Sequence, residues 1–433
     1  MSESTPQFLP SPPVARFGGR PLRRRGRELW RRRGVRGGAL VVALTVCGAV
    51  ILALVRDQTG TEGFLVGLAL AVLPVPALMA VFRWLDRVDP GPWRNLFFAF
   101  AWGSCAAALV AIIANSFATE WLATATADPS GAQSLGATAI APVIEESAKG
   151  TAVLLLFLFR RRHFTGVVDG VVFAGFTATG FAFTENILYL GNAFGEDRTL
   201  GGGAGLASFT VATFFVRIVL SPFAHPLFTV LTGIGFGLST VARGRHGRLL
   251  RVALPLAGLF GAMGMHALWN SSSGVFPPFG FYLVYGLFMV PVFGLVTWVT
   301  IWARQRDLRT VSAVLPAYVA AGWFGPAAPY ALSSMRARTA ARDFAGRTYG
   351  ATAARAVAEH GRHATALAML RHQAEQGVSV PDFAAREREL LHRIWERREP
   401  AGAALLHAAR ATGRVPVPPP YLDHWAPNPY REL

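Results

Sequence analysis

The sequence predicts an all-α protein: a polytopic membrane bundle of about eight transmembrane helices with a cytoplasmic α-helical C-terminal region. Of the 433 residues, 52% are hydrophobic and only 15% are charged, whereas soluble proteins carry roughly 25% charged residues. Apolar runs of the roughly 20 residues that a bilayer core requires alternate with short arginine clusters. The two cysteines, Cys47 and Cys105, fall inside apolar runs and offer neither a disulfide framework nor a metal-binding pair.

The N-terminal segment, residues 1–37, is proline-rich and then strongly basic. We expect a disordered cytoplasmic arm that lies on an anionic membrane surface. The formal net charge of +17 also raises nucleic-acid binding. However, the arginines stand beside apolar runs, where lipid headgroups and the positive-inside rule account for them. The expected partners therefore include membrane lipids and no nucleic acid.

Residues 38–303 form the predicted transmembrane domain. Its predicted cytoplasmic loops carry ten arginines and its predicted external loops carry two, which predicts a multi-pass membrane protein with both termini in the cytoplasm. Pro222 is expected to break the long sixth segment, because proline removes a helical hydrogen bond. The eight predicted spans are 38–55, 61–82, 95–118, 136–159, 166–191, 207–242, 252–272 and 279–303.

Residues 304–433 are predicted to form a cytoplasmic helical region with a Pro-rich tail. Two stretches of helical composition, 364–376 and 383–397, flank a break and predict a helical hairpin. Residues 312–332 are apolar, but prolines and a glycine interrupt them. These interruptions favour an interfacial or cytoplasmic helix over a ninth span.

Ionisable residues at membrane depth are costly and usually functional, and the predicted spans contain few of them. With about 1.5 Å of rise per residue, Glu145, Glu185, His225 and His266 stand roughly 21–28 Å above the cytoplasmic helix ends. Four helices therefore bring them to one layer in the outer half of the bilayer, which indicates a site. The full set is Glu145, Glu146 and Lys149 on the fourth span, Asp169 and Glu185 on the fifth, Arg217 and His225 on the sixth, and His266 on the seventh.

Lys149 is the only lysine in a chain with 41 arginines. This exception predicts that position 149 requires a compact ammonium, which the planar guanidinium of arginine does not replace. Lys149 follows Glu145 and Glu146 by four and three residues, so on a helix it can neutralise either carboxylate.

The residue types fit amide hydrolysis, which requires a carboxylate to activate water and neutral donors to stabilise an oxyanion. Asn270, one turn beyond His266, is expected to be such a donor. Glutamate and histidine also suit Zn²⁺ with water in an open position, so a zinc mechanism and a metal-free glutamate mechanism both stay open. Taken singly, these groups also fit structural ion pairs or interhelical hydrogen bonds. Arg217 either extends its guanidinium to the membrane surface or closes the site, and both roles stay open. Asp169 is expected to pair with an arginine.

Over about residues 80–300 the chain resembles the PrsW family of intramembrane proteases, relatives of the CAAX prenyl endopeptidases. Glu145-Glu146-Ser147-Ala148-Lys149 matches the EExxK motif, and Phe181-Ala182-Phe183-Thr184-Glu185 matches FxxxE. His225 and the segment His266-Ala267-Leu268-Trp269-Asn270 match later histidine motifs. CAAX enzymes show EExxxR and FxxxH instead, so Lys149 and Glu185 set this chain apart from prenyl-protein processing.

The resemblance implies an intramembrane (metallo)endopeptidase that cleaves a single-span, membrane-anchored protein, such as an anti-sigma factor, near its extracytoplasmic side. In this hypothesis Glu145 activates water, and Glu146 and Lys149 set its charge state. Glu185, His225 and His266 hold either a zinc ion or the oxyanion, and Asn270 donates a further hydrogen bond. A non-catalytic membrane scaffold or self-immunity protein of the same fold stays open. A transporter with a carboxylate relay is disfavoured, because no internal repeat is visible.

Overall fold

The computed structural model describes residues 26–201, 207–242, 246–274, 279–377, 380 and 382–415. Across these residues the chain is helical and contains no strand, which confirms the predicted all-α class. Most of the basic arm, residues 1–25, and the Pro-rich tail, residues 416–433, lie outside the described residues. Helix α1 already begins at Gly26, inside the segment predicted to be disordered. Arginine, glutamate and leucine in residues 26–33 favour helix, which explains this difference.

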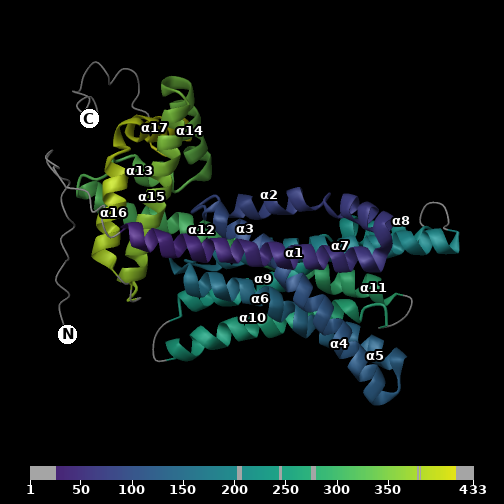
Figure 1. Cartoon of the computed structure of the whole chain (residues 1–433). Helices are drawn as coiled ribbons and strands as arrows, with labels where there is room; N and C mark the ends of the chain where they lie inside the picture. Colours follow the sequence, from purple (N-terminus) through teal and green to yellow (C-terminus); the bar gives the residue numbers. More distant parts are fainter. Residues whose placement is uncertain are drawn as a thin grey trace, which may run out of the picture. The chain divides into compact units, whose positions relative to one another are not determined.

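The chain divides into two compact units that meet in the sequence between Ala303 and Arg304. The membrane unit lies before this point and the C-terminal unit, Arg304–Leu433, after it. Helix α12, Val290–Ala320, contains this boundary. The other helices of the membrane unit (Figure 1) are α1 Gly26–Ala71, α2 Val75–Leu85, α3 Trp93–Ala101, η1 Trp102–Ala107, α4 Ala108–Thr126, α5 Pro129–Leu135, η2 Gly136–Ile140, α6 Ala141–Phe159, η3 Arg161–His163, α7 Val167–Leu200, α8 Phe209–Phe214, η5 Phe215–Leu220, α9 Ala224–Thr240, α10 Gly247–Asn270, α11 Gly280–Leu283 and η6 Val284–Met289.

Six helices among the described residues are long and apolar enough to cross a membrane. They are Gly37–Leu85, Trp93–Thr126, Val167–Leu200, Phe209–Thr240, Gly247–Asn270 and Gly280–Ala320. The first covers two predicted spans and is interrupted at Gly60, whose φ of 70° leaves the helical region. Helix α6 is not among the six, and it carries three charged residues within one short stretch. The protein is thus a polytopic membrane helix bundle, and the count of eight spans stays a prediction.

The predicted break at Pro222 is confirmed. The π-helical turn η5 ends at Leu220 and α9 begins at Ala224. Proline lacks the backbone N–H that would continue the helix. The first turn of α9 therefore starts in the interior of the bundle and carries His225 there.

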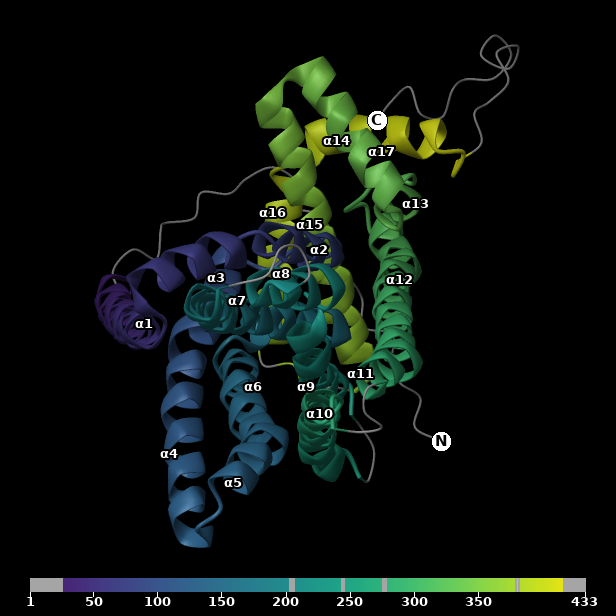
Figure 2. The ribbon, with the colours of Figure 1, turned by 90° about the vertical axis from the view of Figure 1, so that its right-hand side faces the viewer.

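Helix α7 forms the centre of the membrane unit, and nearly all of its middle is buried. Its small residues let other backbones approach closely, as is common between membrane helices. A methyl group at Gly170 would collide with the carbonyl of Gly233 on α9, and one at Gly180 would collide with the carbonyl of Phe100 on α3. Figure 2 views α7 almost end-on, with α3 and α6 beside it. These close crossings fix the depth at which neighbouring helices present their side chains.

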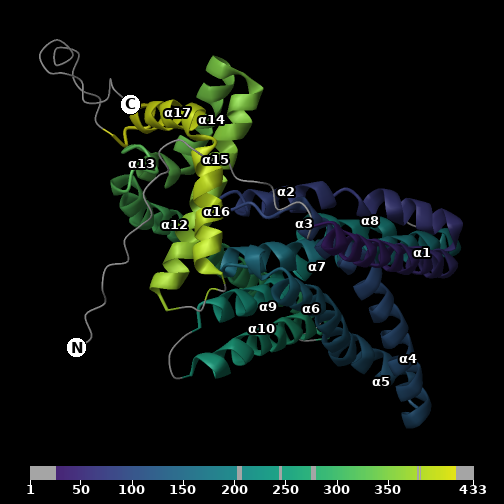
Figure 3. The same ribbon diagram turned by 60° about the vertical axis from the view of Figure 1, so that its left-hand side comes forward.

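The C-terminal unit is a packed set of helices (Figure 3). Residues 312–320 continue α12 instead of forming a separate interfacial helix. The reason is burial: Val311, Leu315 and Tyr318 point into the core of this unit and are fully buried. The predicted helical hairpin is confirmed by α15 and α16, which pack together. The remaining helices are α13 Ala328–Leu332, α14 Met335–Tyr349, α15 Ala351–Glu375, α16 Phe383–Trp395 and α17 Arg398–Ala411.

Candidate active site in the membrane unit

Six of the seven predicted site residues meet inside the membrane unit. Helix α6 supplies Glu145, Glu146 and Lys149, α7 supplies Glu185, α9 supplies His225 and α10 supplies His266. Five of them are buried, and the Glu185 side chain is 16% exposed. A hydrogen bond from Trp102 Nε1 to the carbonyl of Ala148, 3.0 Å long, ties α6 to η1 beside the cluster.

Asn270 is the predicted residue that the structure does not bring into the cluster. It shares a helical face with His266, but α10 ends at Asn270. Its Nδ2 donates to the carbonyl of Ala137 in η2, at 2.8 Å. Asn270 therefore joins the C-terminal end of α10 to η2, and its amide is engaged there.

The Lys149 ammonium lies at the centre of the cluster and is fully buried. Its Nζ is 2.8 Å from Glu146 Oε1, 3.3 Å from Glu145 Oε2 and 3.1 Å from His225 Nδ1. It also sits 3.8 Å from the centroid of the Phe181 ring. An ammonium has three hydrogens, so all three find acceptors here.

Glu146 is saturated with hydrogen bonds. Its Oε1 accepts from Lys149 and from His266 Nδ1, the latter at 3.1 Å, and its Oε2 accepts from Thr229 Oγ1 at 2.8 Å. A carboxylate only accepts, so His266 Nδ1 must carry the hydrogen. The lone pair of the neutral imidazole then lies on Nε2, which is 3.9 Å from Glu145 Oε2.

His225 is fixed in the opposite tautomer. Its Nδ1 faces Lys149, which can only donate, so Nδ1 accepts. Its Nε2–H therefore donates to Glu185 Oε2, at 2.6 Å. Each imidazole is thus oriented by a carboxylate, the arrangement that orients histidine in many metal and catalytic sites.

Glu185 closes the cluster together with Arg217 on η5. The Arg217 guanidinium pairs with Glu185, and its Nε donates to Asn186 Oδ1 at 2.7 Å. It also stacks on the Tyr189 ring, with Cζ 4.0 Å from the centroid. Of the two roles that the sequence left open for Arg217, this geometry supports closure of the site.

Asp169 takes no part in the cluster. It was expected to pair with an arginine, but its carboxylate accepts hydrogen bonds from the backbone N–H and the hydroxyl of Thr165.

Sequence reasoning missed Asn115 and Thr229. Asn115 on α4 donates to Glu145 Oε1 at 3.3 Å, and its own Oδ1 is buried without a partner. An asparagine within an apolar run was a visible signal. Thr229 lies one helical turn after His225, so the four-residue spacing could have found it.

The segment that a known family matches contains these residues. Residues 91–296 match the model of the PrsW family intramembrane metalloprotease. This segment is therefore similar to the PrsW family. The Protease PrsW of Clostridioides difficile (strain 630) is 33% identical over 94 residues, which cover 22% of this chain and 34% of that protein. The Protease PrsW of Geobacillus kaustophilus (strain HTA426) is 28% identical over 171 residues, which cover 40% of this chain and 65% of that protein.

The PrsW resemblance inferred from the motifs is therefore confirmed. The chain spans less than two thirds of the length of either relative. No solved structure gives a significant match.

Because the PrsW description includes a metalloprotease, we tested whether the residues fit a metal ion. Glu145, His225 and His266 each offer a ligand atom, and these atoms lie within 4.8 Å of one another. This set places Glu145 where the sequence had placed Glu185. Two histidines and a glutamate are a known catalytic zinc set. However, Lys149 already contacts two of the three, Glu145 and His225. With the ammonium in place, the arrangement does not fit a divalent cation.

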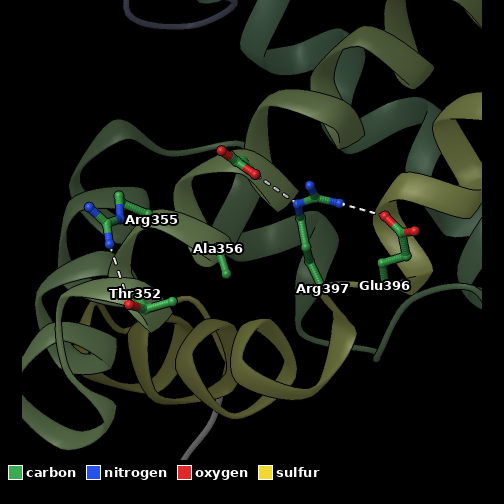
Figure 4. A pocket seen from close by; sticks show the side chains of 6 residues that line it. Thr352, Arg355, Ala356, Glu396 and Arg397 are labelled. Carbon is green, nitrogen blue, oxygen red and sulfur yellow. Dashed lines mark hydrogen bonds and ion pairs between the residues drawn. The ribbon is translucent and has the colours of Figure 1, made fainter.

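A hollow on the C-terminal unit, shown in Figure 4, is lined by charged side chains but offers little free charge. Arg397 pairs with Glu359 at 2.8 Å and with Glu396 at 3.0 Å. Arg355 donates to Thr352 at 3.3 Å. Because both arginines already donate to acceptors of the same unit, we assign no ligand to the hollow.

Proposed function

We propose that the protein is an intramembrane endopeptidase that hydrolyses a peptide bond of a single-span, membrane-anchored protein, with an anti-sigma factor as the substrate class. The family match and the buried carboxylate–imidazole cluster support this proposal. We place the enzyme in a bacterial plasma membrane with both termini cytoplasmic, because arginine favours the inner side. Its partners are then the substrate and membrane lipids, with no role for nucleic acid.

One observation carries the proposal: Glu145 is the least engaged carboxylate of the three. Glu146 is saturated, and Glu185 is held by His225 and Arg217. Glu145 has only long contacts, 3.3 Å to Asn115 and 3.3 Å to Lys149. Its Oε2 faces His266 Nε2 at 3.9 Å, and with a neutral His266 both atoms accept hydrogen bonds. We place the attacking water between these two groups, where it can donate to both.

In this mechanism Glu145 takes one proton from that water, and the resulting hydroxide attacks the carbonyl carbon of the peptide bond. The Lys149 ammonium supplies positive charge beside the oxyanion that forms. The tetrahedral intermediate then loses its amine, which takes the proton from Glu145. His266 and Glu146 orient the water, and Glu185 keeps His225 in the tautomer that accepts from Lys149.

The test is co-expression with candidate single-span substrates, followed by immunoblot detection of the cleavage fragment. Wild type is expected to cleave, and Glu145→Gln to lose cleavage, because the amide is not a base. Glu120→Gln, on the exposed outer part of α4, is the matched control and should cleave normally. If Glu145→Gln cleaved at the wild-type rate, Glu145 would not be the base. A scaffold function would also tolerate this substitution.

A further inference from the structure

The orientation of the two imidazoles defines where a cation would bind. His225 Nε2 is engaged by Glu185 and His266 Nδ1 by Glu146. The lone pairs therefore lie on His225 Nδ1 and His266 Nε2. Together with the Glu145 carboxylate, these atoms form a histidine–histidine–glutamate set backed by two outer carboxylates, which is how zinc-binding histidines are commonly oriented.

The Lys149 ammonium contacts two of these three ligand groups. Its Nζ lies 3.1 Å from His225 Nδ1 and 3.3 Å from Glu145 Oε2. A zinc ion would stand about 2.0–2.2 Å from the same two atoms. Both positions lie against the same pair of atoms, so a bound zinc ion would face the ammonium at close range. Two like charges in a buried, low-dielectric site repel strongly.

The charges of the cluster support the same conclusion. Three carboxylates, Glu145, Glu146 and Glu185, face two cations, Lys149 and Arg217. With neutral histidines the cluster carries a single net negative charge, which a divalent ion would reverse. Removal of the ammonium would leave two negative charges, which one divalent ion would neutralise.

We propose that the Lys149 ammonium fills the cation position of a latent His–His–Glu site, so that the native chain holds no divalent metal there and loss of the ammonium opens the site to Zn²⁺. This accounts for the single lysine of the chain as an internal cation. The occupant has to be compact, because the position is fully enclosed and lies against the Phe181 ring.

The experiment measures metal content, which is independent of any cleavage assay. Full-length wild type, Lys149→Ala, Lys149→Gln and Lys149→Arg are purified in detergent, incubated with Zn²⁺, desalted and analysed by mass spectrometry for metal. The same proteins are titrated with Co²⁺, whose visible absorption reports coordination. Wild type and Lys149→Arg should hold little metal. At least one of the two neutral variants should hold about one equivalent with tetrahedral Co²⁺ absorption.

His266→Ala, introduced into wild type and into the neutral variants, separates this site from adventitious binding to other histidines. It should abolish the metal gained by Lys149→Ala or Lys149→Gln. The proposal is overturned if wild type retains about one equivalent of Zn²⁺ that His266→Ala removes. It is also overturned if both neutral variants fold and neither binds metal. Failure of the proposed protease function would appear instead as absent cleavage in wild type, whatever its metal content.

Discussion

Thr229 offers a sharp test of the buried network, because its hydroxyl holds the one carboxylate that orients both Lys149 and His266. Replacement by valine keeps the size and β-branched shape of the side chain. It removes the 2.8 Å hydrogen bond to Glu146 Oε2. Thr229 and Glu146 are both fully buried, so no water from outside replaces the lost donor.

The expected cost follows from the charge on Glu146. A hydrogen bond to a charged group contributes about 1.5–3 kcal/mol, and a buried acceptor left unpaired costs a similar amount. At about 2–4 °C per kcal/mol for a unit of this size, the melting temperature should fall by roughly 3–12 °C. Activity should fall by at least about tenfold if 1.4 kcal/mol of this loss reaches the transition state, because Glu146 also orients Lys149 and His266.

The assay combines thermal unfolding in detergent with the substrate-cleavage assay. Thr229→Ser keeps the hydroxyl and should retain most stability and activity. Thr151→Val is the matched control, because the Thr151 hydroxyl bonds only to the backbone carbonyl of Ser147 on its own helix. If Thr229→Val melted and cleaved like wild type while Thr151→Val behaved identically, the network would not hold the site together.

Three further predictions concern packing, acid stability and topology. Gly170→Ala should lower the free energy of unfolding by about 1–3 kcal/mol, because the added methyl group would collide with the Gly233 carbonyl. Gly264→Ala on α10 is the control and should leave stability unchanged, because the space around Gly264 is open. Equal melting temperatures of the two variants in thermal unfolding would refute the packing argument. Burial lowers the pKa of His360 from 6.5 to about 4. Between these two pH values the unfolded chain binds a proton at His360 and the folded C-terminal unit does not. The free energy of unfolding should therefore fall by about 3 kcal/mol as the pH drops from 6.5 to 4. Limited proteolysis of the C-terminal unit of wild type should become faster as the pH falls over this range, and the acceleration should be weaker in His360→Leu. The same pH profile in both proteins would contradict the prediction. A topology reporter fused after residue 306 should lie in the cytoplasm, and a reporter inserted in the loop near residue 128 should lie outside the cell. An external reporter after residue 306 would mean that the number of spans is wrong by one.

The sequence alone predicted the all-α membrane class of the protein and six of the residues that meet in the cluster. Glu145, Glu146, Lys149, His225 and His266 stand out because ionisable side chains are expensive in lipid and therefore rare there. Helical rise converted their positions into a common depth, and the structure places them in contact. The i,i+3 and i,i+4 pairing of Lys149 with two glutamates also follows from spacing alone, since both partners share one helix.

The tertiary structure decided which group does what, because that depends on how different helices face one another. The crossings of α7, set by glycine contacts with α3 and α9, turn Glu185 toward Arg217 and His225. Glu145 joins the two histidines in its place. Asn270 shares a face with His266, but at the end of α10 it meets the backbone of η2. Helical periodicity records the face of a side chain within its own helix, whereas the partner across the interface is set by close packing between helices that lie far apart in the sequence.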